Sequence, residues 1–456
     1  MISNRLLRSV TVILLFYLFY LYTHTHVKPL ESYIYRDNTG IKKLFVQKLF
    51  YIYNWSDDVI DRWPRVYTHE RLGIEEKYKS NFGIGEAIDD TIGLYDTHQY
   101  SLFRTFYYRL SESKYRTHDP KQASIFFIPY DIGMDCSINN DNGGLMPTKC
   151  PMMKKVLDLL KHEYDDDHND LEKTKVCYFN RNSGHDHFLL LSINQPMWHF
   201  INHKNWDLYK ACFNCTKLSI DTYPKQLFKP LQNHDFLNNN WHSIPFPSSF
   251  HNNKNADKLP WKSNTASMRQ FPLSLMGSLK ITSKVNRNLR EILMDECSNR
   301  PKDCLLNKLD SHDSQSISNS IRHMPYAKSV LCLMPGGDFP SRKGVLDAML
   351  FGCIPVVFNL YTAHYQMPWF WNMETANDCM IYIDRHNVTN SVRTVFDQLV
   401  AMSVDSNFIV GKLKCISRIG QSLQYNAPFN SNVRENDAVD IVIERLLQKK
   451  HQPMIY

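Results

Sequence analysis

The stretch LCLMPGGDFPSRKGVLDAMLFGCIPVVFN, from Leu331 to Asn359, decides the fold class. The apolar run SVLCLM that ends at Met334 predicts a buried strand. Gly336 and Gly337 follow it, and glycine permits a backbone turn that other residues do not adopt. Ser341 then stands where it can cap a helix. A strand, a glycine-rich turn and a helix start are the first half of a βαβ unit.

The second half of the unit follows directly. Gly352 lies where a helix end favours a left-handed residue, and residues 354–358 predict a second parallel strand. The apolar stripe of the intervening helix consists of Val345, Leu346, Met349 and Leu350. In such a unit the amino end of the helix directs free N–H groups to the carboxyl edge of the sheet, where anions bind. An ordinary βαβ crossover with a solvated Arg-Lys pair is the alternative.

Two familiar phosphate motifs are absent from this stretch. After Gly337, the Walker A spacing would require Lys and then Ser or Thr, but Arg342, Lys343 and Gly344 stand there. The dinucleotide pattern G-x-G-x-x-G is also missing. Ser341 and Arg342 at the helix start remain as a phosphate cradle, with Asp347 about a turn and a half further on as an acceptor for sugar hydroxyls.

Length and composition place this unit in a larger α/β chain. The 456 residues favour two domains, and 43% hydrophobic residues allow sizeable cores. The net charge of +7 is spread without a basic block, which argues against nucleic acid as a partner. We expect a cytoplasmic tail and signal-anchor helix over 1–22, a stem over 23–90, and two Rossmann-like domains over 91–265 and 266–456.

Further elements are expected on both sides of an Asn- and Pro-rich connection at about 225–265. In the first domain, Leu102 to Leu110 predicts a helix, Ala123 to Pro129 a strand, and KVCYF, ending at Phe179, another strand. In the second, FPLSLMGSLK predicts the first strand, NRNLREIL a helix and IVIERLLQ a closing helix. This alternation favours parallel sheets covered by helices.

The N-terminal segment predicts a membrane anchor that leaves the chain in the secretory lumen. Arg5 and Arg8 precede an uncharged run that ends at Tyr22, and no small-residue cleavage site follows. A cleaved signal peptide is the alternative. Asn54, Asn214 and Asn387 begin glycosylation acceptor patterns.

The eleven cysteines suit an oxidising compartment. They include no two C-x-x-C motifs at zinc spacing. Two local disulfides are expected in polar loops, Cys136–Cys150 and Cys297–Cys304. Cys332 and Cys353 lie in apolar runs and are expected to be buried thiols.

Several ordered motifs resemble the exostosin-type glycosyltransferases, glycosyltransferase family 47. MPGGDFPSRKGVLDAMLFGCIPVVFN is similar to the C-terminal signature of that family, in which Glu is more common at the position of Asp347. RTHDPKQASIFFIPYDI, NRNSGHDHFLLLS, SIPFPSSFH and LMGSLK with NRNLREIL resemble further landmarks in the same order. The similarity covers roughly residues 91 to 375.

This resemblance implies a GT-B architecture, with two Rossmann-like domains that face each other across a cleft. It also implies a Golgi enzyme of type II topology that transfers sugar from a nucleotide donor, UDP-linked, to a glycan or glycoprotein acceptor with inversion. The donor would lie on the C-terminal domain. Its diphosphate and ribose would contact Gly277, Ser278, Arg287, Arg290, Ser341, Arg342 and Asp347.

Inversion needs a base for the acceptor hydroxyl and a stabiliser for the leaving diphosphate. Asp186 and His187 are the candidate base and its orienter, because they are expected to follow a strand; capping of a helix that begins at Phe188 is the alternative. The run Asp165–Asp167 contains D-x-D but reads as a solvated loop, so no metal cofactor is expected and arginine would neutralise the donor. Trp261, Trp369 and Trp371 are either sugar-stacking or core residues.

Two other function classes fit part of the sequence. One is a non-catalytic GT-B-shaped subunit in a hetero-complex with another Golgi transferase, and the other is a secreted carbohydrate-binding protein. Alternating polymerisation of two sugars is not expected, because the chain has no room for the second transferase domain of bifunctional exostosins.

Overall fold

A computed structural model of the chain describes residues 33–36, 42–45, 48–55, 80–99, 101–131, 152–162, 178–192, 211–221, 240–252, 259–262, 269–309, 325–428 and 436–449. The chain divides into two units, residues 1–49 and residues 50–456. In the first unit, β1 (Tyr33–Arg36) pairs antiparallel with β2 (Lys42–Phe45). All other elements described below concern the second unit, apart from the first residue of β3.

The first sheet has six strands in the order β10-β9-β8-β7-β3-β6. The strands of this sheet are β3 (Leu49–Ile52), β6 (Arg116–Thr117), β7 (Ala123–Ile128), β8 (His187–Leu191), β9 (Thr216–Ser219) and β10 (Trp241–Ser243). The run from β7 to β10 is parallel throughout, with Phe126 opposite His187 and Phe188 opposite Thr216. The carboxyl ends of these four strands therefore meet at one edge.

Helices and short pieces accompany this sheet. They are α4 (Leu102–Ser111), α6 (Met153–His162), α7 (Tyr178–Arg181), η2 (Ser80–Gly83), η3 (Pro120–Gln122) and the antiparallel pair β4 (Ala87–Asp89) and β5 (Leu94–Tyr95). The apolar face predicted for α4 is confirmed, because Leu102, Phe106 and Leu110 are fully buried.

The second sheet has five parallel strands in the order β12-β11-β13-β14-β15. Its bounds are β11 (Phe271–Gly277), β12 (Cys304–Lys308), β13 (Ser329–Met334), β14 (Ile354–Val357) and β15 (Ile381–Tyr382). In chain order this is a 2-1-3-4-5 sheet, whose topological switch point lies between β11 and β13. Ligands of such sheets bind at the carboxyl ends of the two strands that flank the switch point.

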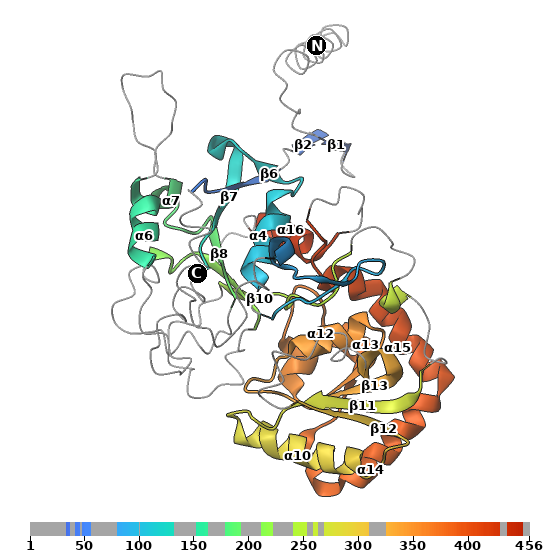
Figure 1. The fold of residues 1–456 in the computed structure, drawn as a ribbon. Coiled ribbons are helices and arrows are strands. Elements are labelled where there is room, and N and C mark those ends of the chain that lie inside the picture. Colours follow the sequence, from blue (N-terminus) through green and yellow to red (C-terminus); the bar gives the residue numbers. More distant parts are fainter. Residues whose placement is uncertain are drawn as a thin grey trace, which may run out of the picture. The chain divides into compact units, whose positions relative to one another are not determined.

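Helices cover both faces of the second sheet (Figure 1), with α10 and α14 on one face and α12 and α13 on the other. The bounds are α10 (Lys284–Ser298), α12 (Lys343–Leu350), η10 (Tyr361–Tyr365), α13 (Met373–Cys379), α14 (Arg385–Val404), α15 (Ser406–Ile419), η8 (Pro260–Lys262), η11 (Gly420–Leu423) and α16 (Ala438–Lys449). The predicted βαβ unit β13-α12-β14 is confirmed, and Gly352 has the expected positive φ of 69°.

The last helix, α16, returns to the elements of the first sheet and contacts α4 and β7. Arg109 of α4 donates from Nε to Asp437 Oδ2 and from Nη2 to Asp440 Oδ2, both at 2.7 Å. Asp437 is fully buried, so this pair holds the amino end of α16 against α4. The predicted domain boundary at residue 265 therefore assigns α16 to the second domain, although α16 packs on α4 and β7 of the first.

Two cysteine predictions have different outcomes. The Cys297–Cys304 disulfide is confirmed, and it joins the end of α10 to the start of β12. The prediction that Cys332 and Cys353 are thiols is wrong, because they form a disulfide that joins the middle of β13 to the residue before β14. Both are fully buried, and burial was the only property that the apolar runs could indicate. A further disulfide joins Cys379 to Cys415, whereas the Cys136–Cys150 pair lies outside the described residues.

The predicted strand at KVCYF is wrong over its last two residues, since Tyr178 and Phe179 belong to α7. The strand comes nine residues later than Tyr178, as β8, which begins at His187. The alternative of a helix from Phe188 is wrong for the same reason. Short apolar runs of this kind fit a buried strand and a buried helical turn equally well.

No helix among the described residues is long and apolar enough to cross a membrane. The predicted anchor over 1–22 and the acidic run Asp165–Asp167 lie outside the described residues.

Candidate functional site

The carboxyl edge of the second sheet forms the candidate site, at the switch point between β11 and β13. Gly277 ends β11, and Pro335, Gly336 and Gly337 follow β13. The helix α12 begins beside them at Lys343, with Arg342 as its N-cap residue. No side chain caps this helix end, so its first free N–H groups remain available to an anion.

Two arginines span the switch point. Arg290 of α10 donates from Nε to Gly336 O at 2.9 Å and from Nη1 to Ser278 O at 2.5 Å. Arg342 donates from Nη1 to Pro335 O at 2.9 Å, and its Nη2 lies 3.4 Å from Met276 O. Arg290 therefore contacts the chain after both strands, and Arg342 contacts the residue after β13 and the penultimate residue of β11, so both bridge the two sides of the switch point.

The charge of this pair is not balanced by a hydrogen-bonded carboxylate among the described residues. Asp338 lies near Arg290, but its Oδ1 accepts from the N–H and the hydroxyl of Thr282. Arg290 is 4% exposed. Burial, together with the neighbouring Arg342 charge, lowers the pKa of Arg290 to about 9, and burial lowers the pKa of Arg342. Two desolvated cations without a hydrogen-bonded carboxylate among the described residues favour binding of an anionic ligand.

The glycines of this edge serve close packing rather than a left-handed backbone, which corrects the expected reason for Gly336 and Gly337. Neither is among the residues with positive φ. A Cβ at Gly336 would lie 2.7 Å from Nδ2 of Asn286, and that amide donates to Gly337 O at 2.7 Å. The side chains of α10 therefore reach the loop after β13 because Gly336 has no side chain.

Of the other residues predicted to bind the nucleotide-sugar donor, two lie at the switch point and one does not. Gly277 and Ser278 lie at this edge as expected, with Ser278 partly exposed. Arg287 is exposed, and its guanidinium donates to Ile281 O, so it does not contact the switch point.

Ser341 and Asp347 have protein partners that the sequence did not indicate. Ser341 does not cap α12, because its Oγ donates to Oδ2 of Asp221 at the edge of the first sheet. Asp347 is 4% exposed, and its two oxygens accept from Ser249 N at 2.8 Å and from Lys343 Nζ at 2.6 Å. In this structure Asp347 therefore holds α12 against residues 248–252 and is not presented to a ligand.

The predicted base and orienter lie at the opposite end of the first sheet. Asp186 precedes β8 and His187 begins it, so the expectation that they follow a strand is wrong. They are 2% and 1% exposed. Asp186 Oδ1 lies 2.8 Å from His187 Nδ1, its Oδ2 accepts from Arg181 at 3.1 Å, and His187 Nε2 lies 2.6 Å from the Tyr53 hydroxyl. The geometry assigns both to the core under α7.

Two carboxylates that the sequence reasoning missed lie at the carboxyl edge of the first sheet. Asp131 follows β7 and accepts from Ser192 Oγ at 2.7 Å, and Asp221 follows β9 and accepts from Ser341. Both are nearly or fully buried. The sequence carried a usable signal for Asp131, since an acid directly after a predicted strand of a parallel sheet lies at the ligand-binding edge.

The other predicted residues lie away from this site. Asn54 and Asn387 are exposed, whereas Asn214 is half-buried and its Nδ2 donates to Ser183 O. Trp261 and Trp371 are core residues at 1% and 3% exposure. Trp369 is partly exposed and stacks on His242, with ring centroids 4.2 Å apart.

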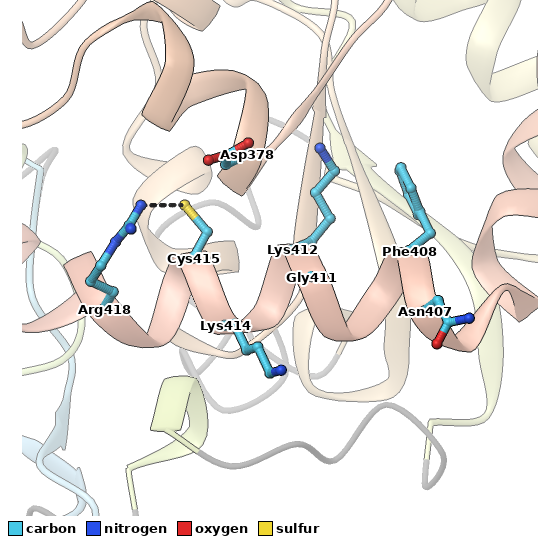
Figure 2. A pocket seen from close by; sticks show the side chains of 8 residues that line it. All are labelled: Asp378, Asn407, Phe408, Gly411, Lys412, Lys414, Cys415 and Arg418. Atoms are coloured by element: carbon cyan, nitrogen blue, oxygen red, sulfur yellow. Dashed lines mark hydrogen bonds between the residues drawn. The ribbon is translucent and has the colours of Figure 1, made fainter.

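A hollow of about 640 Å³ lies on the outer helices of the second half. Figure 2 shows Lys412 and Cys415 extending from α15 toward the side where Asp378 of α13 lies. The Lys412 amine donates to Asn377 O and Met380 O, and Cys415 is bonded to Cys379. These groups hold α13 against α15, and none of the lining residues comes from a carboxyl edge of either sheet. We therefore assign the hollow no part in the site.

The sequence of this chain is similar to a known family and to several characterised or probable enzymes. The family model of the Exostosin GT47 domain matches residues 33–398. Three relatives from Arabidopsis thaliana are named xyloglucan-specific galacturonosyltransferase 1 (27% identical, covering 82% of this chain and 52% of the relative), probable xyloglucan galactosyltransferase GT20 (28%, 83% and 63%) and probable xyloglucan galactosyltransferase GT19 (26%, 82% and 83%). The chain thus spans between half and two thirds of the first two relatives.

Among solved structures, a glycosyltransferase from Rickettsia africae ESF-5 is 9% identical, with a TM-score of 0.32 over 59% of this chain and 71% of that one.

Proposed function

Since the chain belongs to the exostosin GT47 family of glycosyltransferases, we propose that it moves a sugar from a UDP-linked donor to a hydroxyl of a glycan acceptor, with inversion of configuration. We further propose that the two sheets are the two halves of a GT-B enzyme. The observation that carries the proposal is the pair Arg290 and Arg342 at the switch point, which has no hydrogen-bonded carboxylate among the described residues.

The donor diphosphate is assigned to this pair and to the amino end of α12. A pyrophosphate carries negative charge that increases on the leaving group as the bond to the sugar breaks. Arginine donors and helix N–H groups stabilise that charge in place. Because two arginines supply the charge, we propose that transfer needs no metal ion, so activity should survive chelation of divalent cations with EDTA.

Asp221 is the proposed base in place of Asp186. It lies at the carboxyl edge of the first sheet. There it accepts a hydrogen bond from Ser341, the residue directly before Arg342. Asp131 lies at the same edge but after β7, two strands from β9, and it accepts from Ser192 Oγ, a residue of the first sheet's own edge. A carboxylate opposite the diphosphate is where an inverting reaction needs its base.

The proposed step balances as a single displacement. The acceptor hydroxyl gives its proton to the Asp221 carboxylate, and its oxygen forms a bond to the anomeric carbon of the donor sugar. The bond from that carbon to the diphosphate oxygen breaks, and UDP leaves with the bonding electron pair. Inversion results because attack and departure occur on opposite faces of the sugar.

The names of the relatives guide the proposed donor sugar. They refer to galactosyl and galacturonosyl transfer to xyloglucan. We propose UDP-galactose or UDP-galacturonate as the donor and a xyloglucan-like polysaccharide as the acceptor. A Golgi location with type II topology, anchored by residues 1–22, and glycosylation at Asn54 and Asn387 complete the proposal, since both asparagines are exposed.

A nucleotide-sugar panel with the full chain tests this function. UDP, UDP-galactose, UDP-galacturonate, UDP-glucose and GDP-mannose are compared by thermal shift, and transfer to xyloglucan oligosaccharides is followed by NMR of the new anomeric proton. We expect UDP and one UDP-sugar to raise the melting temperature and the product to have inverted configuration. A chain that binds no nucleotide and gives no product would instead fit a non-catalytic partner subunit.

A further inference from the structure

Gln366 is a buried amide without a partner. It follows the π-helical turn η10 that comes after β14, and it is 1% exposed. Neither its Oε1 nor its Nε2 makes a hydrogen bond to any described residue. A buried polar group left unpaired lowers the stability of the folded chain. An unpaired group in a native structure therefore calls for an explanation, such as a ligand that completes it.

The surroundings of Gln366 place it where the edges of the two sheets meet. Ser243, the last residue of β10, donates from Oγ to the main-chain oxygen of Gln366. Three residues further on, Trp369 stacks on His242 of the same strand, with an angle of 26° between the rings. The segment after β14 thus touches the carboxyl edge of the first sheet.

The same segment is joined to the proposed diphosphate site. Thr362 of η10 donates from Oγ1 to Pro340 O at 2.9 Å, and Pro340 directly precedes Ser341 and Arg342. Short π-helical turns are rare and frequently occur at functional sites. Gln366 is therefore four residues from a direct contact with the loop that leads into α12.

Building on the function proposed above, we propose that the side-chain amide of Gln366 binds hydroxyl groups of the donor sugar and selects that sugar. A carboxamide offers two donors and an acceptor, which match neighbouring hydroxyls. It carries no charge, so it suits the sugar better than the diphosphate. A sugar attached to a diphosphate at Arg342 would lie between the two edges, where both substrates must meet.

The sugar reaches Gln366 when the contacts between these edges separate. The contacts between β10 and this segment include the hydrogen bond from Ser243 and the stack of Trp369 on His242. Each such contact contributes modestly to stability. New hydrogen bonds to the amide offset this loss in the donor complex.

Gln366→Met in the full chain tests the proposal, because Met keeps the length and removes the amide. UDP and UDP-galactose binding are measured by calorimetry, and kcat and KM are measured with UDP-galactose and its single deoxy analogues. We expect unchanged UDP affinity and a loss of about 5- to 150-fold in kcat/KM. We also expect the variant to lose discrimination against one deoxy donor that the wild type rejects. The melting temperature should stay equal or rise, since an unpaired amide has been removed.

Gln270→Met is the matched control, because Gln270 is exposed just before β11. A Gln366→Met variant that keeps kcat/KM within twofold of this control overturns the proposal, as does an equal loss of affinity for UDP itself. A lower melting temperature with unchanged deoxy-donor discrimination indicates a purely structural role and also overturns it. If the wild type neither binds UDP nor uses any donor, the proposed function itself fails, and this inference fails with it.

Discussion

The carboxyl edges of the two parallel sheets carry opposite chemistry. The edge of the second sheet holds Arg290 and Arg342, two cations whose hydrogen bonds go to main-chain carbonyls. The edge of the first sheet holds Asp131 and Asp221, which accept from serine hydroxyls. The same α/β geometry therefore presents a positive edge, to which we assign the anionic donor, and an acidic edge, to which we assign the acceptor hydroxyl.

In the proposed reaction the two functions lie on different sheets, with the arginines on one edge and the base on the other. The contact from Ser341 to Asp221 links residues 120 positions apart.

The largest expected effect is a loss of kcat when the proposed base on the acidic edge, Asp221, is replaced. Asp221→Asn removes the proposed base and leaves the arginine pair intact, so we expect kcat to fall about 10²- to 10⁴-fold while UDP affinity stays unchanged. Initial rates of transfer and calorimetric titration with UDP measure the two quantities. If Asp221→Asn keeps its turnover and Asp131→Asn loses it, the base belongs to β7 instead.

A carboxylate at the opposite end of the first sheet, Asp186, is expected to affect stability and not turnover. Asp186 lies there in a buried network with His187 and Arg181. Asp186→Asn should lower the free energy of unfolding by about 1–3 kcal/mol, because a buried charged partner of these groups is lost. The kcat of the folded variant should change by less than about threefold. Urea denaturation and transfer rates at saturating donor separate the effects, and a large loss of kcat at full stability would restore Asp186 as the base.

A smaller effect concerns the segment that leads from the first sheet toward the second. His251 is fully buried, with Nδ1 2.7 Å from Tyr425 O and Nε2 2.8 Å from Thr97 Oγ1. Burial lowers the pKa of His251 to about 3, below its ordinary value of 6.5. The unfolded chain therefore binds more protons between these values, and stability is lost as the pH falls below about 6.5.

Each pH unit in this window should cost up to about 1.4 kcal/mol through His251. Unfolding by urea at pH 7, 6 and 5 measures this slope. His251→Asn has no group that titrates there, so its stability should depend less on pH across the same interval. Identical slopes in the wild type and the variant would show that His251 is not the group responsible.

The sequence was informative wherever local pattern determines structure. The unit β13-α12-β14, the strand β11 with α10, and the helices α4 and α16 follow from apolar periodicity and from glycine positions. Arg342 could be found because it stands at the helix start after a predicted strand, whereas Arg290 was named through the family resemblance. Family resemblance added the donor class.

Contacts between distant residues account for what could not be predicted. Asp347 accepts from Ser249, 98 positions away, and Ser341 donates to Asp221. Asp347 is therefore not presented to a sugar hydroxyl, and Ser341 does not cap α12, although their local positions suggested these roles. The Cys332–Cys353 disulfide depends on the pairing of β13 with β14. Asp186 was misplaced because a short apolar run was read as a strand, which shifted the assumed edge of the sheet.

The most direct test of the central claim is a titration of UDP, and of uridine as a ligand without phosphate, into the wild type, Arg342→Ala and Arg287→Ala. Arg342 lies at the switch point, whereas Arg287 is an exposed arginine of α10 whose guanidinium donates to Ile281 O, away from the switch point. We predict that Arg342→Ala weakens UDP binding about 10- to 150-fold, the value of a charged hydrogen bond, and leaves uridine unaffected. Equal UDP affinity in all three proteins would contradict the assignment of the donor diphosphate to this edge.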